Sequence, residues 1–366
     1  MSAQVRILSC DGGGIRGLLT TIVLEALEEE IKAINPTSSL SECFDVFAGT
    51  STGSIIACGL ANGFSAAKIR RFYEQRGAAI FPEMDAAFWV GEVLERAMRG
   101  HLSLPLFRPN GLEQVLRSDD VFPDGLLFGQ LSKETLVVSY DTFNRKAVVF
   151  KSRDHKSATI PVWQVCRASS AAPVAFPGFQ LDNEHFLKTH FEGGNVEGDL
   201  VRMIPANGLP LIDGGVLANN PVLCAIAEQV NKICKECQPT QENPLQRLQV
   251  ASFGTGQPGG RISPDNVETW GALAWADLVR GVPLYQVCAD GSADVIDYVA
   301  ASLLGSSYQR FQPVLWDKTT GEEVSISTFQ ADGATMQRIR DVAARYIADP
   351  QESKRLQKLA ETITKP

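Results

Sequence analysis

The chain has 366 residues, of which 44% are hydrophobic and 21% charged, close to globular averages, which argues against a disordered or fibrous architecture. Its formal net charge of −8, without any cluster of Lys and Arg, argues against a nucleic-acid polymer as partner, because such partners require a basic face. The length suits one large α/β domain or two of ordinary size.

Hydrophobic runs and cysteines predict a cytoplasmic protein. Residues 5–8 form a first strand with no basic segment before them, so we expect no secretory signal. No apolar stretch reaches the roughly 18 to 20 residues that a membrane-spanning helix needs, so we expect only peripheral, transient membrane contact. The eight scattered cysteines do not resemble a disulfide framework, which favours a reducing compartment.

Two strand–loop–helix units are predicted near the start of the chain. An apolar strand over residues 5–9 precedes the loop SCDGGGIRG, and apolar residues then recur at helical spacing over 18–34. A second strand over 44–48 leads into the loop GTSTG and an apolar helix over 52–61. The repeated unit predicts an α/β fold with a mainly parallel central sheet.

The remaining chain is predicted to complete a single domain spanning residues 1–366. Residues 77–110 place much apolar area between Gly and Pro and suggest no single element. Residues 257–366 are less defined and end in helices with a charged outer face over 333–362. Four further strands are expected, over residues 136–140, 146–150, 210–212 and 248–253.

The first glycine loop, read from Gly12, satisfies G-x-G-x-x-G, the pattern of a dinucleotide-binding turn between a strand and a helix. That hypothesis requires an acid about 20 residues further on, at the end of a second strand, to hold the ribose. Around residues 35–39 the sequence has neither a strand nor such an acid. Asp11 would also place a carboxylate beside the pyrophosphate. We therefore reject a dinucleotide and expect no cofactor.

The second glycine loop, residues 49–53, fits the G-x-S-x-G pattern of a nucleophile elbow. The flanking glycines allow a sharp turn from strand to helix, which would leave Ser51 strained and exposed at the carboxyl edge of the sheet. The helix over 52–61 would direct the positive end of its dipole at a reacting oxygen. The pattern alone is weak, but its position between a strand and an apolar helix strengthens it.

A serine on such a turn needs a base. In Ser-His-Asp hydrolases with this elbow the histidine comes last in the chain. An apolar strand ending at Asp213, before two glycines, follows all the histidines instead, and we expect Asp213 to emerge at the same carboxyl sheet edge as Ser51. The alternative is an acid that merely ends a strand in an Asx-turn. The chain has four histidines, each interpreted as a solvated loop residue: His101, His155, His185 and His190.

A Cys-x-x-Cys pair, Cys234 and Cys237, raises the question of a zinc site. The pattern lacks a second Cys-x-x-Cys, and the pair ends a predicted helix over 222–235. Two thiols at a helix end are the better interpretation. No acidic cluster or EF-type loop suggests calcium either, so we expect no metal.

Four motifs occur in a fixed order: DGGGIRG, GTSTG, ASSAAPVAFP at residues 168–177, and DGG at 213–215. Together they resemble the patatin-like phospholipases, over residues 5–256. The resemblance implies a three-layer α/β/α sandwich, related to but distinct from the α/β hydrolases. It implies that Ser51 is a nucleophile and Asp213 its partner in a Ser-Asp dyad. It also implies that Arg16 supports the glycine loop, and that backbone N–H groups form an oxyanion hole: those of Gly12, Gly13 and Gly14.

Chemistry supports these implied roles. Attack of the Ser51 hydroxyl on an ester puts negative charge on the carbonyl oxygen, which bare glycine N–H groups can stabilise. Asp213 must accept the serine proton, which a carboxylate of ordinary pKa near 3.9 does poorly. We therefore expect Asp213 to be desolvated, with a raised pKa.

The resemblance further implies a serine lipid acyl hydrolase of phospholipase A or lysophospholipase type, acting on glycerolipids at a membrane interface. Residues 77–110 then become a candidate lid or acyl-channel segment, with ordinary core packing as the equal alternative. Two other hypotheses stay open. One is the same hydrolase acting as an anti-phage effector, switched on by a cyclic nucleotide. The other is a non-catalytic lipid-binding or storage protein, which the presence of both Ser51 and Asp213 disfavours.

Overall fold

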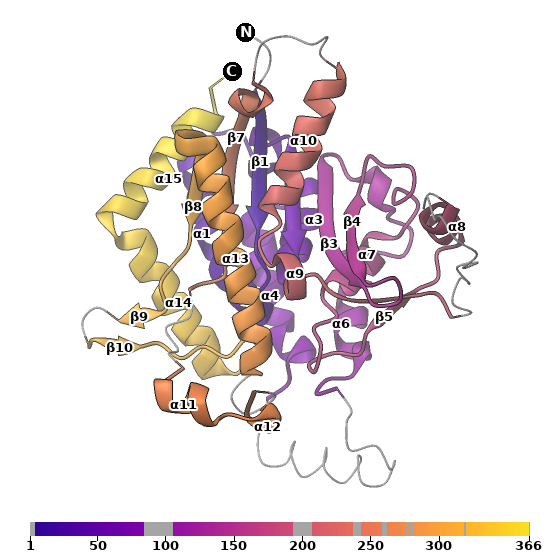
Figure 1. Cartoon of the computed structure of the whole chain (residues 1–366). Coiled ribbons are helices and arrows are strands. Elements are labelled where there is room, and N and C mark those ends of the chain that lie inside the picture. Colours follow the sequence, from indigo (N-terminus) through magenta and orange to yellow (C-terminus); the bar gives the residue numbers. More distant parts are fainter. Residues whose placement is uncertain are drawn as a thin grey trace.

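The structure is a computed structural model that describes residues 4–83, 105–192, 207–236, 243–257, 262–275, 277, 282–317 and 320–365. A sheet of eight strands passes through its centre in the order β5-β6-β3-β2-β1-β7-β8, with β4 paired to β3 (Figure 1). The strands are β1 (Val5–Cys10), β2 (Val46–Thr50), β3 (Glu134–Asp141), β4 (Lys146–Lys151), β5 (Phe179–Leu181), β6 (Leu209–Asp213), β7 (Leu248–Phe253) and β8 (Tyr308–Phe311). A separate two-stranded sheet pairs β9 (Trp316–Asp317) with β10 (Glu322–Glu323).

The sheet is mainly parallel, as predicted. Neighbouring strands in the series β3, β2, β1, β7 and β8 pair in parallel. Strands β4 and β6 are antiparallel to β3, and β5 is antiparallel to β6, so this side of the sheet is mixed. The six predicted strands are all present, although β2 begins two residues later than expected. The short strands β5 and β8 were not predicted.

Helices cover both faces of the sheet and complete the expected three-layer α/β/α arrangement (Figure 1). Side chains alternate across β1: Leu8 packs with the core around α1, α3 and α4, whereas Ile7 packs with α10 and α13 on the opposite face. The helices are α1 (Gly17–Ile34), α2 (Leu40–Cys43), α3 (Thr52–Ala61), α4 (Ala66–Ile80), α6 (Pro109–Leu116), α7 (Val162–Ser169), α8 (Glu184–Glu192), α9 (Gly215–Ala218), α10 (Val222–Glu236), α11 (Pro264–Thr269), α12 (Ala272–Trp275), α13 (Pro283–Leu304), α14 (Gly333–Ala348) and α15 (Pro350–Ile363).

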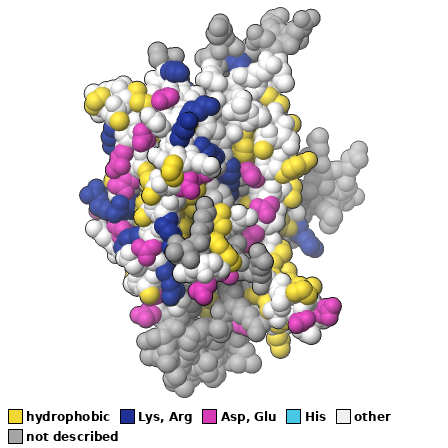
Figure 2. Space-filling view, turned by 90° about the vertical axis from the view of Figure 1, so that its left-hand side faces the viewer, with side chains coloured by type: hydrophobic (Ala, Val, Ile, Leu, Met, Phe, Trp, Pro, Cys, Tyr) yellow, Lys and Arg dark blue, Asp and Glu magenta, His cyan; other side chains and the backbone are white. Residues whose placement is uncertain are grey.

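The last two helices, α14 and α15, pack on α1 and bury one apolar face each, including Ile339 and Leu359. Figure 2 shows that acidic and basic side chains are interspersed over this side of the molecule. This pattern agrees with the predicted charged outer face. None of the helices that the structure describes is long and apolar enough to cross a bilayer.

One detail of the register positions the candidate site. Strand β4 occupies one edge of β3 from Leu136 to Asp141. On the other edge of β3, β2 pairs up to Val138 opposite Thr50, and β6 begins its pairing at Ser139 opposite Asp213. Because β2 is parallel and β6 antiparallel to β3, the two strands run toward each other and their carboxyl ends meet. The prediction that Asp213 and Ser51 emerge at one carboxyl edge of the sheet was therefore wrong, because β6 is antiparallel, but the two strand ends do come together.

Candidate active site

Ser51 lies on a strained turn between β2 and α3. Its φ of 53° and ψ of −126° fall where L-residues are rarely found, and such positions cost roughly 1–3 kcal/mol. The Ser51 N–H donates to Ser169 Oγ at 2.8 Å, and Ser169 in turn donates to the Val138 carbonyl at 2.6 Å. The turn leaves no room for a side chain at position 53, since an ideal Cβ on Gly53 would lie 2.1 Å from the Cys10 carbonyl oxygen. The predicted strained elbow is thus present, but Ser51 is buried and not exposed as expected, because side chains of neighbouring elements pack around it.

Asp213, the last residue of β6, is fully buried. Its Oδ1 accepts a hydrogen bond from the Gly215 N–H at 2.7 Å, while Oδ2 makes no hydrogen bond of ordinary geometry to the described residues. Burial raises the pKa of Asp213 from 3.8 to about 7, opposed by the Gly215 hydrogen bond and by the nearby Ser51 hydroxyl. The carboxyl group is desolvated as expected and can exchange a proton near neutral pH.

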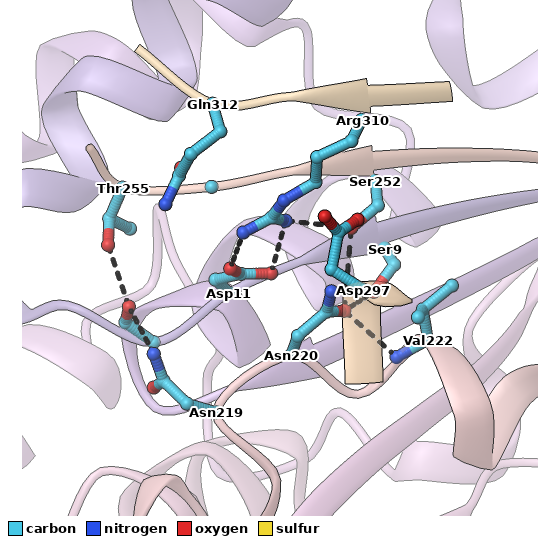
Figure 3. Close-up of polar contacts among 12 residues, drawn as sticks. Ser9, Asp11, Asn219, Asn220, Val222, Ser252, Thr255, Asp297, Arg310 and Gln312 are labelled. Atoms are coloured by element: carbon cyan, nitrogen blue, oxygen red, sulfur yellow. Dashed lines mark hydrogen bonds and ion pairs between the residues drawn. The ribbon is translucent and has the colours of Figure 1, made fainter. Parts of the chain in front are cut away.

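The first glycine loop forms hydrogen bonds with Thr255 and Asn219 (Figure 3). The Gly12 carbonyl accepts from Thr255 Oγ1 at 2.8 Å and from Asn219 Nδ2 at 3.4 Å. The Gly12 N–H donates to the Asn219 carbonyl at 3.0 Å, so this group is already used, contrary to its expected role as an oxyanion donor. The N–H groups of Gly13 and Gly14 make no hydrogen bond to the described residues, and Gly14 adopts a φ of +57°.

A buried ion pair that the sequence analysis missed anchors the same loop. Arg310 on β8 donates to Asp11 Oδ1 at 2.9 Å and to Ser252 Oγ at 2.8 Å, and its second terminal nitrogen contacts Asp11 Oδ2 (Figure 3). Burial raises the pKa of Asp11, opposed by the Arg310 guanidinium. Asp11 therefore neutralises the charge of Arg310, and this ion pair holds the glycine loop against β8. The two residues are too far apart in the chain for any local pattern to pair them.

Arg16 lies beside the glycine loop, and both line the same small cavity. Its side chain is buried, and the guanidinium makes no hydrogen bond to the described residues, including the glycine loop. Burial lowers the pKa of Arg16, opposed by the negative charge of Asp290 on α13. Tyr285 of the same helix was also missed: an ideal Cβ on Gly215 would lie 3.0 Å from both Tyr285 Oη and Asp213 Oδ1. Burial and the charge of Asp213 raise the Tyr285 pKa.

Ser51 separates two small cavities of about 20 Å³ each, about the room one water needs. One, called the polar cavity here, has a mixed lining that includes the glycine loop, Arg16, Tyr285 and Asp290. The other is apolar, with side chains from four parts of the chain: Ile80, Phe81, Leu112, Phe176 and Phe329. Ile80 and Phe81 belong to the segment 77–110 that was predicted as lid or core, and both are buried here. Residues 84–104 of that segment lie outside the described residues.

No described histidine lines either cavity. His190 was interpreted as a solvated loop residue, but it lies on α8, with Nε2 3.3 Å from Asp141 Oδ2 and its ring stacked on Phe186. His185 also lies on α8 and contacts the His155 carbonyl at 3.0 Å. His101 is outside the described residues.

Within the described parts of the chain, no three His, Cys, Asp or Glu side chains gather as they would around a metal ion. Cys234 is an exposed free thiol at the end of α10, in agreement with the predicted helix, and Cys237 lies outside the described residues.

The fold and the site together define a class: an α/β sandwich that carries a serine on a strand-to-helix elbow, beside a buried carboxyl group and a glycine loop. Residues 8–226 match the family model described as patatin-like phospholipase. The chain belongs to this family and is a lipid acyl hydrolase.

Individual relatives are similar in sequence to this chain over most of its length. Patatin-like protein 2 of Arabidopsis thaliana is 29% identical over 343 residues, covering 88% of this chain and 78% of that protein. Patatin-like protein 1 of Oryza sativa subsp. indica is 30% identical over 328 residues, covering 83% and 71%. Among solved structures, VipD from Legionella pneumophila is a distant likeness, with a TM-score of 0.43 and 12% identity over 98% of this chain and 67% of that one.

Proposed function

We propose that the chain hydrolyses glycerolipid acyl esters through a Ser51–Asp213 dyad without histidine. The observation that carries this proposal is the meeting of β2 and β6, which brings a strained serine and a buried carboxyl group of pKa about 7 together. The free N–H groups of Gly13 and Gly14 form the oxyanion hole, and Gly12 holds the loop in place. The apolar side chains around one cavity contact the start of the acyl chain, and the other cavity, with the glycine loop, faces the remainder of the lipid.

The first half of the reaction acylates the enzyme. The Ser51 hydroxyl transfers its proton to the Asp213 carboxylate as its oxygen bonds to the ester carbon. The electron pair of the C=O bond moves to oxygen, where the two glycine N–H groups stabilise the charge; one missing donor typically costs about 2.7–4 kcal/mol. The tetrahedral intermediate then expels the lipid alcohol, which takes the proton from Asp213.

The second half releases the fatty acid. A water molecule gives a proton to Asp213 as its oxygen attacks the acyl-Ser51 carbon. Collapse of this intermediate breaks the bond to Ser51 Oγ, which recovers the proton from Asp213. The helix dipole of α3 favours the negative charge on the reacting oxygen in both halves.

Activity should rise with pH through about 7 and then level, since Asp213 acts only when ionised and its pKa is about 7. Below that pKa, each unit of pH should lower kcat/KM about tenfold, because the ionised fraction falls by that factor. Hydrolysis of a short-chain p-nitrophenyl ester from pH 5 to 9 measures this limb. A profile that is flat over this range would contradict the role of Asp213 as base.

Replacement of His190 by alanine should leave ester turnover within a few-fold of the original. His190 is engaged with Asp141 and Phe186, and it lines neither cavity at Ser51. The test is ester turnover with circular dichroism to verify folding, and His155→Ala on the exposed surface is the matched control. Loss of activity in folded His190→Ala alone would indicate a triad and overturn the dyad.

The substrate itself is tested by lipid mass spectrometry. Mixed vesicles of phospholipids, lysophospholipids and galactolipids are incubated with the chain, and released fatty acids and lysolipids are identified. The same incubation with added cyclic nucleotides tests a nucleotide activator. Absence of any released acyl product, under all conditions, would contradict the proposed activity and favour a non-catalytic lipid-binding protein.

A further inference from the structure

A larger cavity lies apart from the glycine loop, lined by residues of α3 and α4, the segment between them and residues 120–122. Its volume is about 350 Å³, within the range of small-molecule sites. The rings of Phe64 and Phe122 stack there, with their centroids 6.2 Å apart. More than half of the lining is apolar: Ile55, Phe64, Ile69, Phe72, Val121 and Phe122. We call it the α3–α4 cavity.

The charged residues of the α3–α4 cavity leave an excess of positive charge. Arg76 is neutralised by Asp120, with two contacts of 3.0 and 2.8 Å. Lys68 and Arg71 form no ion pair with the described residues, and Lys68 Nζ lies 3.3 Å from the centroid of the Phe64 ring. Asp120, whose pKa Lys68 also lowers, is the one carboxylate among the described lining residues, against three cations. In a chain of net charge −8, this excess of positive charge beside an aromatic cavity favours a ligand with an apolar body and a negative head.

The cavity is also a neighbour of the candidate active site. Ile55, one turn into α3, lines both the α3–α4 cavity and the apolar cavity beside Ser51. On α4, Ile69 lines the first cavity and Tyr73 the second. A thin layer of side chains on two helices thus separates the place where an acyl chain is cleaved from the place where an anionic amphiphile fits.

We propose that the α3–α4 cavity binds a long-chain fatty acid, with its carboxylate held by Lys68 and Arg71 and its hydrocarbon chain against the phenylalanines. The reaction proposed above releases this chemical class, so the inference rests on that function for the source of the ligand. Binding itself can be measured without turnover. An anionic phospholipid shares the same chemistry, and the experiment below separates the two sources.

The test titrates full-length Ser51→Ala protein, which cannot turn over an ester, with the fluorescent 18-carbon cis-parinaric acid. Adding Lys68→Glu and Arg71→Glu should weaken binding about tenfold or more, because both charge-assisted contacts are lost. The matched control adds Lys354→Glu and Lys358→Glu on the exposed surface of α15, which change the net charge equally and should leave affinity unchanged. Circular dichroism verifies folding of each variant.

A series of ligands tests which parts of the fatty acid the α3–α4 cavity recognises. A fatty alcohol of equal length should bind at least about tenfold more weakly than the acid, and butyrate should not compete, because both the charge and the chain contribute. Equal affinity of the Lys68/Arg71 variant and the α15 control would overturn the proposal and place the acid at Ser51 alone. The Lys68/Arg71 variant is also tested on vesicles that contain phosphatidylglycerol. If this variant loses vesicle binding but still binds the acid, the proposal is overturned in favour of an anionic lipid surface as the ligand. Hydrolysis by the unmodified chain is assayed separately, so failure of the proposed function is distinguishable from failure of this site.

Discussion

Replacement of Ser51 by alanine is expected to abolish ester hydrolysis, by about a thousandfold or more. The hydroxyl oxygen is the atom that bonds to the acyl group, and alanine has no atom that can take its place. Alanine carries a Cβ like serine, so the backbone at φ 53° should be no more strained than before. Turnover of a p-nitrophenyl ester and release of fatty acid from vesicles measure the effect, and thermal unfolding should change little.

The matched control is Ser302→Ala, which removes a hydroxyl from the exposed face of α13 and should keep full activity. Mass spectrometry of the intact chain after brief exposure to a slowly released ester should detect an acyl adduct on the original but not on Ser51→Ala. A folded Ser51→Ala chain with undiminished turnover would refute the mechanism outright.

Replacement of Asp213 by asparagine should lower kcat about 10²- to 10⁴-fold, the usual contribution of a general base. Asparagine is similar in shape, and its side-chain oxygen can still accept the Gly215 hydrogen bond. It cannot take the proton from Ser51. The ester assays used for Ser51 measure this loss, and Asp119→Asn on the exposed surface is the control. Retained turnover would move the base to another residue.

The same substitution should stabilise the fold at alkaline pH. The unfolded chain releases the Asp213 proton near pH 3.8, whereas the folded chain keeps it up to about pH 7. Between these values the folded state binds more protons, so stability falls as pH rises, by about 4 kcal/mol in total. Asparagine does not titrate and avoids this loss. Thermal unfolding should therefore show Asp213→Asn more stable than the original at pH 8, with a smaller difference at pH 5.

A stability gain that is equal at both pH values would contradict this explanation, since only the titrating carboxyl group makes the difference depend on pH. Together with the loss of activity, a gain confined to high pH would identify Asp213 as a residue that favours catalysis at the expense of stability.

Local patterns predicted six strands and a minority of the described helices. The period of apolar residues located α1, α3, α14 and α15, and short apolar runs located six strands, because these signals depend on neighbours within one or two turns. The elbow at Ser51 was predictable for the same reason: a strand, two glycines and a helix within ten residues determine its backbone. The strands β5 and β8 were missed because three or four residues carry little periodicity.

Contacts between distant parts of the chain decided the rest. Gly12 was expected as an oxyanion donor, but Asn219, which follows β6, takes its N–H. Arg310 neutralises Asp11, and Tyr285 lies beside Asp213, because β8 and α13 return to the sheet late in the chain. No local periodicity encodes such pairings, which depend on strand order and direction.

The sequence by itself determined which residues could do the chemistry: a serine on a sharp turn, an acid at the end of a strand and glycines in a loop. Only the tertiary structure decided how they meet. Strand β6 runs against β2 along the same edge of β3, so that the strand ends next to Ser51 and at Asp213 meet, and burial raises the Asp213 pKa to about 7. Residue types are local, whereas strand direction and desolvation arise from the packing of the whole chain.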